Sequence, residues 1–228
     1  MPEKNLGELY IVATPIGNLQ DITLRAVEIL GKIDWLLAED TRITTRLLRR
    51  YNVKVNLKTF HEHSDEQKFS WVLERLQAGD KLALVSDAGT PGICDPGGKL
   101  VAFVRENLPE TKIIPLPGAS ALTAVLSVAG ISANQFVFLG YPPHKKGRQT
   151  FFKKIGCWEI RPIVFYESCY RFQKALDSLE ENLIPEQKIF IGREVTKIYE
   201  EFFFGKIVEA KKYFTREKLK GEFVIVVE

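Results

Sequence analysis

Acidic side chains stand at the ends of two apolar, strand-like runs of this sequence. The run LLAED closes with Glu39 and Asp40, and the run LALVSD closes with Asp87. In open α/β sheets, ligands bind just outside the carboxyl ends of the strands. Asp87 is the obvious polar contact for such a ligand, and Glu39 and Asp40 are placed for acid/base chemistry. We therefore predict a site at this edge; the alternative is a set of ligand-free connections between strands and helices.

A pair of histidines precedes a helical pattern. The segment FHEHSDEQ places His61 and His63 on one side of an extended stretch, with Glu62 between them. No third histidine and no cysteine cluster accompanies them, so a metal site is not predicted. We favour acid/base chemistry or contact with RNA for His61, with a plain loop before a helix as the alternative.

Loops rich in glycine and proline follow three of the apolar runs. The longest covers residues 86–97 and contains three glycines, and its Asp95 followed by Pro96 is typical of a helix start. Shorter loops of this kind are TPIGN and PLPGAS. None of them matches a GxGxxG or Walker pattern, so a dinucleotide or ATP is not expected. We predict that they form the walls of a ligand site; small residues that permit close helix packing are the alternative.

Two basic segments have the composition of a nucleic-acid contact. On a helix through TRITTRLLRR, four arginines share about one third of the circumference: Arg42, Arg46, Arg49 and Arg50. The segment YPPHKKGRQTFFKK mixes aromatic residues with positive charges that include Lys145, Lys146 and Arg148. A solvated helix face and a charged surface loop are the respective alternatives.

Alternating strand and helix patterns indicate α/β architecture with largely parallel strands. One predicted helix carries Phe69, Val72 and Leu76 on one face, and SDEQ before it reads as a capping box that begins at Ser64. Late in the chain, EEFFFG and GEFVIVVE lie close together, so a mixed sheet is expected there. The prolines of PLPG suggest two domains, residues 1–117 and 118–228.

Composition narrows the class of protein. The 228 residues are 45% hydrophobic and 27% charged, which is typical of a globular protein. No apolar run approaches the roughly 20 residues of a membrane helix, and no secretory signal is visible, so we expect a cytoplasmic protein that does not enter a membrane. The three cysteines are scattered, which argues against disulfides and a structural zinc site. The net charge of +3 is too small to establish a nucleic-acid partner by itself.

Taken together, seven segments closely resemble the branch of the tetrapyrrole methylase family that methylates small-subunit ribosomal RNA. They are TPIGNLQDITLRA, AEDTRITTRLL, FHEHSDEQ, LVSDAGTPGICDPG, PLPGASAL, GYPPHKKGRQ and REVTKIYEE. The resemblance implies two α/β domains with S-adenosylmethionine in the cleft between them, usually in a homodimer. It also implies 2′-O-methylation of a cytidine in the decoding region of 16S ribosomal RNA, with the RNA or the 30S particle as partner.

The resemblance also assigns roles to residues. Those expected to contact the cofactor are Pro15, Ile16, Asp87, Thr90, Ser120, Ala121, Tyr166, Glu167 and Ser168. Glu39, Asp40 and His61 are candidates to activate or orient the ribose hydroxyl, with Arg42 on the adjacent phosphate. Lys197 and Glu194 are weaker candidates. RNA is expected to contact Arg46, Arg49, Arg50, Lys145, Lys146 and Arg148.

Two other functions are compatible with the same scaffold. A methylase of a tetrapyrrole or another small molecule needs no arginine stripe, and its activity does not fall steeply with salt, as RNA recognition does. A non-catalytic RNA-binding or ribosome assembly factor binds RNA without methyl transfer and does not require Asp87. All three loops of the expected cofactor site are intact, which favours an enzyme.

Overall fold

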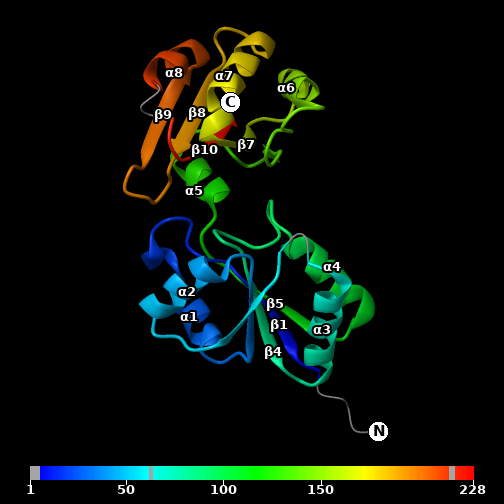
Figure 1. Ribbon diagram of the computed structural model, residues 1–228. Helices are drawn as coiled ribbons and strands as arrows, with labels where there is room; N and C mark the ends of the chain where they lie inside the picture. Colours follow the sequence, from blue (N-terminus) through cyan, green and yellow to red (C-terminus); the bar gives the residue numbers. More distant parts are fainter. Residues whose placement is uncertain (1–5, 62–63, 216–218) are drawn as a thin grey trace. The chain divides into compact units, whose positions relative to one another are not determined.

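The chain forms two compact units, residues Met1–Ser120 and Ala121–Glu228 (Figure 1). The structure is a computed structural model that describes residues 6–61, 64–215 and 219–228. Each unit holds a five-stranded sheet with helices packed on it, which confirms the predicted α/β class. Within the described ranges, none of the helices is long and apolar enough to cross a membrane.

The sheet of the N-terminal unit is entirely parallel, in the order β3-β2-β4-β1-β5. Its strands are β1 (Glu8–Val12), β2 (Trp35–Ala38), β3 (Asn56–Thr59), β4 (Lys81–Val85) and β5 (Lys112–Leu116). The helices between them are the 3₁₀ turn η1 (Leu19–Asp21), α1 (Leu24–Leu30), α2 (Thr41–Arg50), α3 (Glu66–Gln77) and α4 (Gly97–Asn107). Because all five strands run the same way, their carboxyl ends meet at one edge.

Helices cover both faces of this sheet (Figure 1). On one face, Ala26 and Leu30 of α1 and Leu48 of α2 pack on inward-facing strand residues. On the other, Val72 and Leu76 of α3 are buried against the sheet beside α4. Burial on both faces explains why the central strands read as continuous apolar runs rather than as alternating ones.

Two predicted helix starts are shifted in the structure. Helix α3 begins after Asp65, whose carboxylate accepts the backbone N–H of Lys68, so the predicted capping box from Ser64 is wrong. The Ser64 hydroxyl instead accepts the backbone N–H of His61. Helix α4 has Pro96 at its N-cap, one residue later than predicted, and the Asp95 carboxylate accepts the N–H groups of Gly92 and Gly97.

The C-terminal unit has a mixed sheet in the order β6-β7-β10-β8-β9, as predicted. Its strands are β6 (Val137–Phe138), β7 (Ile163–Ser168), β8 (Lys188–Arg193), β9 (Glu201–Lys206) and β10 (Glu222–Val227). Its helices are α5 (Ala121–Val128), α6 (Arg148–Cys157), α7 (Cys169–Asn182) and α8 (Ile207–Tyr213). Strand β10 is antiparallel to both β7 and β8, so β7 and β8 end at the same edge.

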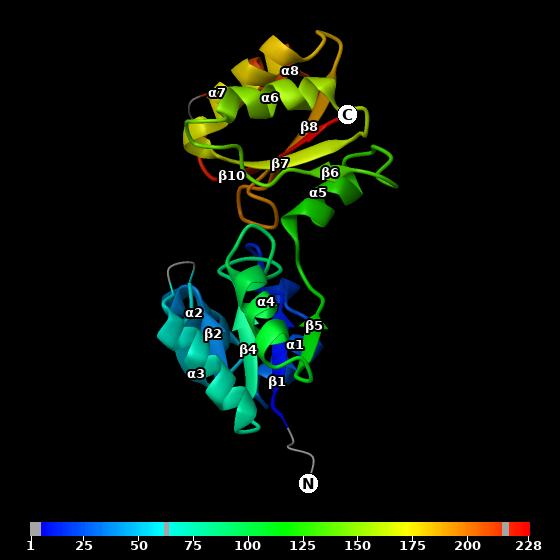
Figure 2. The same ribbon diagram turned by 90° about the vertical axis from the view of Figure 1, so that its right-hand side faces the viewer.

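Figure 2 shows α6, α7 and α8 on one face of this sheet and α5 on the other. The larger core lies under the three helices and is rich in phenylalanine. Phe172 of α7 stacks on Phe223 of β10 with 3.9 Å between the ring centroids, and Phe214 meets both rings edge-on. This packing holds α7 against β10, the strand that pairs with β7.

Candidate functional site

The ends of β2 and β4 are joined by a hydrogen bond between Asp40 and Asp87. Ala38 and Val85 are partners in the two neighbouring strands, so the residues two positions further on also lie opposite each other. There the backbone N–H of Asp40 donates to Oδ1 of Asp87 at 2.9 Å. The sheet thus brings together the two acidic segments that the sequence places at strand ends.

The loops after β1 and β4 are also tied to each other. Thr14 and Gly89 exchange two backbone hydrogen bonds, of 2.9 and 3.0 Å, and the buried Thr14 hydroxyl donates to the Ser86 carbonyl. Gly89 has a φ of +82°, and a Cβ there would lie 3.3 Å from Cγ2 of Ile16. Glycine is therefore required both by the backbone and by the close approach of Ile16.

A pocket of about 170 Å³ opens between these loops and α2. Three residues expected at the cofactor, Pro15, Ile16 and Asp87, share its wall with Ala88 and Arg46. The wall is mostly apolar and carries one carboxylate, that of Asp87, and one guanidinium, that of Arg46. Sites that enclose a whole ligand measure roughly 300–1,000 Å³, so this pocket matches part of one.

The residues of this pocket fit S-adenosylmethionine, the cofactor implied by the resemblance. That molecule has an adenine with flat aromatic faces and polar edges, a positively charged sulfonium, and a methionine part that carries an ammonium and a carboxylate. Ile16 and Pro15 offer apolar contact, and Asp87 offers a negative charge. The missing Cβ at Gly89 lets the loop after β4 lie against Ile16 and the Ala119 carbonyl.

The third predicted loop is connected to the second through Thr90. Its hydroxyl donates to the Ala119 carbonyl at 3.3 Å, next to Ser120 and Ala121. These last two residues are half-buried. Thr90, Ser120 and Ala121 are not in the wall of the 170 Å³ pocket as the described residues form it. Their contact with a cofactor stays a prediction.

Asp40 and Arg42 are paired with each other, which revises their predicted roles. Asp40 caps α2 by accepting the N–H of Arg42 at 2.8 Å, and Nη2 of Arg42 lies 2.6 Å from Oδ2. The side-chain hydrogen bond from Arg42 lowers the pKa of Asp40 to about 2. So acidic a carboxyl is a poor proton acceptor at neutral pH. This pairing speaks against Asp40 as the proton acceptor, and its predicted part in activating or orienting the hydroxyl stays a prediction.

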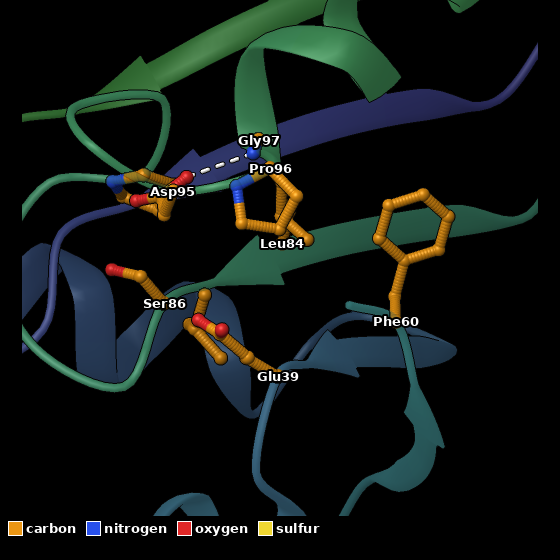
Figure 3. Close-up of a pocket in the computed structure, with 9 residues that line it drawn as sticks. Glu39, Phe60, Leu84, Ser86, Asp95, Pro96 and Gly97 are labelled. Atoms are coloured by element: carbon orange, nitrogen blue, oxygen red, sulfur yellow. Dashed lines mark hydrogen bonds between the residues drawn. The ribbon is translucent and has the colours of Figure 1, made fainter. Parts of the chain in front are cut away.

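Glu39 and His61 follow the neighbouring strands β2 and β3. Glu39 is half-buried and lines a pocket of about 10 Å³ with Ser86 and Asp95 (Figure 3). That volume is close to the space that one water molecule requires. The backbone N–H of Phe60 donates to the Ala38 carbonyl, which holds the start of the His61 segment beside β2. Glu62 and His63 lie outside the described residues.

The arginines of α2 occupy an exposed face, separate from its buried Leu47 and Leu48. Arg46 also lines the 170 Å³ pocket, while Arg49 and Arg50 lie in the last helical turn. There their positive charges interact favourably with the negative end of the helix dipole. The same charges can therefore stabilise α2 without any contact to RNA.

In the C-terminal unit, two residues with predicted ligand contacts, Glu167 and Arg148, are paired with each other. Glu167 is fully buried, with Oε2 2.8 Å from Nη2 of Arg148 and Oε1 3.0 Å from Nε of Arg171. The Glu167 carboxylate is thus occupied by two arginines, and its contact with a cofactor stays a prediction. Arg148 is held largely inside the unit, with its side chain 14% exposed, and its contact with RNA also stays a prediction. Tyr166 and Ser168 are half-buried, and the Ser168 hydroxyl accepts from Arg171 at 3.2 Å.

Lys145 and Lys146 are exposed in the segment before α6, as an RNA contact requires. Lys197 is instead held between Glu194 and Glu222, with Nζ 2.8 Å from a carboxylate oxygen of each. Burial lowers the pKa of Lys197, but these hydrogen bonds outweigh it and raise the pKa above its ordinary value. Lys197 thus stays protonated and is unsuited to take a proton from a hydroxyl.

The sequence reasoning missed Arg171 and Thr14. Arg171 stands four residues after Glu167, but Glu167 lies in β7 and Arg171 in α7, so the helical spacing rule does not apply to them. Their pairing depends on the turn from strand to helix, which the sequence pattern does not show. Thr14 closes the loop after β1 through its buried hydroxyl. Thr14 stands directly before Pro15 at the end of an apolar run, and this position could have identified it as a loop residue of the site.

Comparison with known proteins gives a consistent result. Residues 8–211 match the family described as Tetrapyrrole (Corrin/Porphyrin) Methylases. The chain is 42% identical over 222 residues to Ribosomal RNA small subunit methyltransferase I of Thermotoga maritima, covering 97% of this chain and 98% of that protein. It is 43% identical to the protein of the same name from Synechocystis and 40% identical to that of Escherichia coli O157:H7. Those alignments cover 97% and 99% of this chain and 79% of each relative.

Solved structures share the fold at much lower identity. The methyltransferase CobJ superposes with a TM-score of 0.70 at 20% identity, over 97% of this chain and 93% of CobJ. Uroporphyrin-III C-methyl transferase from Thermus thermophilus, complexed with S-adenyl homocysteine, gives 0.66 at 16% identity, over 97% and 98%. At this identity the likeness concerns the fold alone.

Proposed function

Since this chain belongs to the tetrapyrrole methylase family, and within it to the ribosomal RNA small subunit methyltransferase I branch, we propose that it methylates small-subunit ribosomal RNA with S-adenosylmethionine. The finer proposal is transfer to the 2′-hydroxyl of a cytidine in the decoding region of 16S RNA. The observation that carries it is the pocket in which Asp87, Pro15 and Ile16 meet beside the arginine face of α2.

The N-terminal unit would hold the cofactor through its strand-end loops. Asp87 is fixed by the N–H of Asp40, so its second carboxylate oxygen can accept from the cofactor without reorganising. Ile16 is held by the close approach of Gly89. We assign further contacts to Thr90, Ser120 and Ala121, and to Tyr166 and Ser168 in the C-terminal unit.

The bound cofactor supplies an electrophilic methyl group on a sulfonium. The chain's own residues must align the ribose hydroxyl and remove its proton. Alignment of two reactants can lower a barrier by roughly 7–11 kcal/mol, whereas a general base typically contributes only about 10²–10⁴-fold. We therefore propose that positioning dominates, with Glu39 and His61 as the groups that accept or orient the proton.

RNA would bind the exposed basic residues of both units. On α2 these are Arg46, Arg49 and Arg50, and before α6 they are Lys145 and Lys146. Arg42 presents a largely exposed guanidinium that can contact a phosphate while its pairing with Asp40 sets its direction. The enzyme would act in the cytoplasm as a homodimer, as the resemblance implies.

The decisive experiment follows labelled methyl from S-adenosylmethionine into small-subunit particles and identifies the product nucleoside. We expect label in 2′-O-methylcytidine and its loss in Asp87→Ala. Cofactor binding without label in RNA would point to another acceptor, such as a small molecule. Absence of cofactor binding would favour a non-catalytic RNA-binding factor. Unchanged methylation in Glu39→Ala and His61→Ala, each folded and binding cofactor, would refute the assigned proton acceptors.

A further inference from the structure

A buried ion triad lies at the carboxyl end of β7. The Glu167 carboxylate, which is fully buried, contacts Arg148 at 2.8 Å and Arg171 at 3.0 Å, and their side chains are only 14% and 17% exposed. The backbone N–H of Ser168 donates to the same carboxylate at 2.9 Å. The Arg148 guanidinium also lies over the ring of Phe152, 5.0 Å from its centroid. Each charged group of the triad therefore has a fixed position.

The two arginines of the triad connect it to the segment between β6 and α6. Nη1 of Arg171 donates to the Pro142 carbonyl at 3.5 Å. Arg148 is the first residue of α6, and its N–H donates to the Lys145 carbonyl at 3.3 Å. Further along β7, the N–H of Tyr166 donates to the Gly140 carbonyl at 2.9 Å. Residues 140–148 are thus held to β7 at Gly140 and at Arg148, and to α7 at Pro142.

The charges of this segment differ in exposure. Pro142 is buried and Arg148 is engaged with Glu167, whereas Lys145 and Lys146 are exposed between these anchor points. Replacing a buried ion pair by well-packed apolar residues is often neutral or stabilising, so stability alone does not require a charged triad here. A guanidinium group does, however, fix the orientation of the groups that it binds, because its N–H donors lie in a rigid, planar arrangement.

We propose that Glu167, Arg148 and Arg171 are positioning residues for substrate RNA: they hold residues 140–148 so that Lys145 and Lys146 meet phosphates in a fixed geometry. This inference rests on the proposed function, because it requires RNA as the substrate. For Glu167 and Arg148 it proposes the support of two neighbouring lysines in place of the predicted direct ligand contacts. Arg171 gains a role that its sequence context did not suggest.

The test is a mutant cycle between Arg171 and the lysine pair. Arg171→Lys keeps the positive charge at Glu167 but removes the rigid fork. We compare it with Lys145→Ala/Lys146→Ala and with the triple variant, measuring KM for small-subunit particles, kcat and cofactor affinity. Arg161→Lys is the matched control, because Arg161 is also part-buried and donates to a backbone carbonyl, that of Ile155, before β7 begins.

We expect the lysine pair variant to raise KM for the particles about tenfold, with kcat and cofactor affinity nearly unchanged. We expect Arg171→Lys to raise this KM about fivefold with kcat nearly unchanged. Because Arg171 also donates to the Ser168 hydroxyl, KM is measured at saturating cofactor, so that a change in cofactor affinity is kept apart from it. In the triple variant, Arg171→Lys should add almost nothing, because the groups it positions are gone. The control should leave KM unchanged even where it lowers Tm.

Three results would overturn the inference. If the two effects multiply in the triple variant, Arg171 acts independently of the lysines. If Arg171→Lys is folded and its KM is unchanged, the triad positions nothing that RNA uses. If the lysine pair variant methylates particles normally, the segment does not bind RNA, although the proposed methyl transfer stands. Should wild-type protein transfer no methyl to particles, the proposed function itself fails. Where Arg171→Lys does not fold, Arg148→Lys enters the same cycle.

Discussion

Oδ1 of Asp87 accepts the backbone N–H of Asp40 at 2.9 Å, so the loop after β4 is attached directly to the first residue before α2. Asp87 also lines the pocket that Pro15 and Ile16 help to form. We propose that it binds the cofactor there, and the structural use and the proposed binding use can be separated by mutation.

Replacing Asp87 by asparagine should separate them. The amide oxygen of Asn can still accept the Asp40 N–H, whereas the negative charge is lost. A charge-assisted hydrogen bond contributes about 1.5–3 kcal/mol, so we expect cofactor Kd to rise roughly 10- to 150-fold with little change in Tm. Asp87→Ala should weaken binding and also lower Tm. Calorimetric titration and thermal unfolding measure the two effects; equal Kd values for wild type and Asp87→Asn would refute the ligand contact.

Gly89 and Gly98 form a matched pair of glycines in the same loop and helix region. Gly89 has φ +82° and lies against Ile16, while a Cβ at Gly98 would meet nothing within 4 Å. Gly89→Ala should destabilise the protein by about 1–2 kcal/mol and weaken cofactor binding by displacing Ile16. Gly98→Ala should be neutral or stabilise by up to about 1 kcal/mol. Denaturant unfolding of both variants measures these changes in unfolding free energy. An unchanged unfolding free energy for Gly89→Ala would show that the loop accommodates the added methyl group.

The stability that Asp40 confers should depend on pH only in acid. Its pKa is lowered by the hydrogen bond from Arg42 to about 2, below its ordinary value of 3.8. A depressed folded-state pKa contributes stability above the unfolded pKa, and this is lost as pH falls through the folded value. The difference in unfolding free energy between wild type and Asp40→Asn should therefore be constant from pH 7 to about 5 and shrink between about 4 and 2. A difference that already declines between pH 7 and 5 would contradict this account.

Removal of the buried carboxylate at Glu167 should be costly. Glu167→Gln leaves two guanidinium groups without their partner, and breaking a buried pair in this way typically costs about 3–5 kcal/mol. The exposed pair of Glu28 and Lys32 supplies the control, since both side chains are 62% exposed. Glu28→Gln should leave unfolding nearly unchanged. Urea unfolding of both variants tests the contrast, and similar midpoints would show that the triad is not tightly coupled to folding.

Arg49 and Arg50 should contribute to the salt dependence of RNA binding. If each contacts a phosphate, Arg49→Ala/Arg50→Ala should reduce the slope of log K against log salt by roughly 1.4–1.8. The exposed Arg105 of α4 provides a control whose replacement by alanine should leave the slope unchanged. A lower Tm with an unaltered slope would instead assign these arginines to the dipole of α2.

Much of the architecture could be predicted from the sequence. Apolar runs, intervening helical patterns and the glycine-proline loops indicate an α/β chain with loops at strand ends, because these are local consequences of side-chain pattern. Strand β3 was missed, since NLKT is short and polar and its place at the sheet edge depends on pairing with β2. That pairing positions the segment of His61, so one part of the site was not visible locally.

The sequence by itself determined the family, the strand-end loops and the position of Asp87 after an apolar run. Only the tertiary structure decided which charges are paired. Arg148 and Glu167 are 19 residues apart, and their contact exists because α6 and the end of β7 meet in one core. Arg148 and Lys145 cannot be distinguished by composition, since both are basic residues in one segment. Burial distinguishes them, because a charge removed from water must find a partner, whereas an exposed one remains available to a ligand.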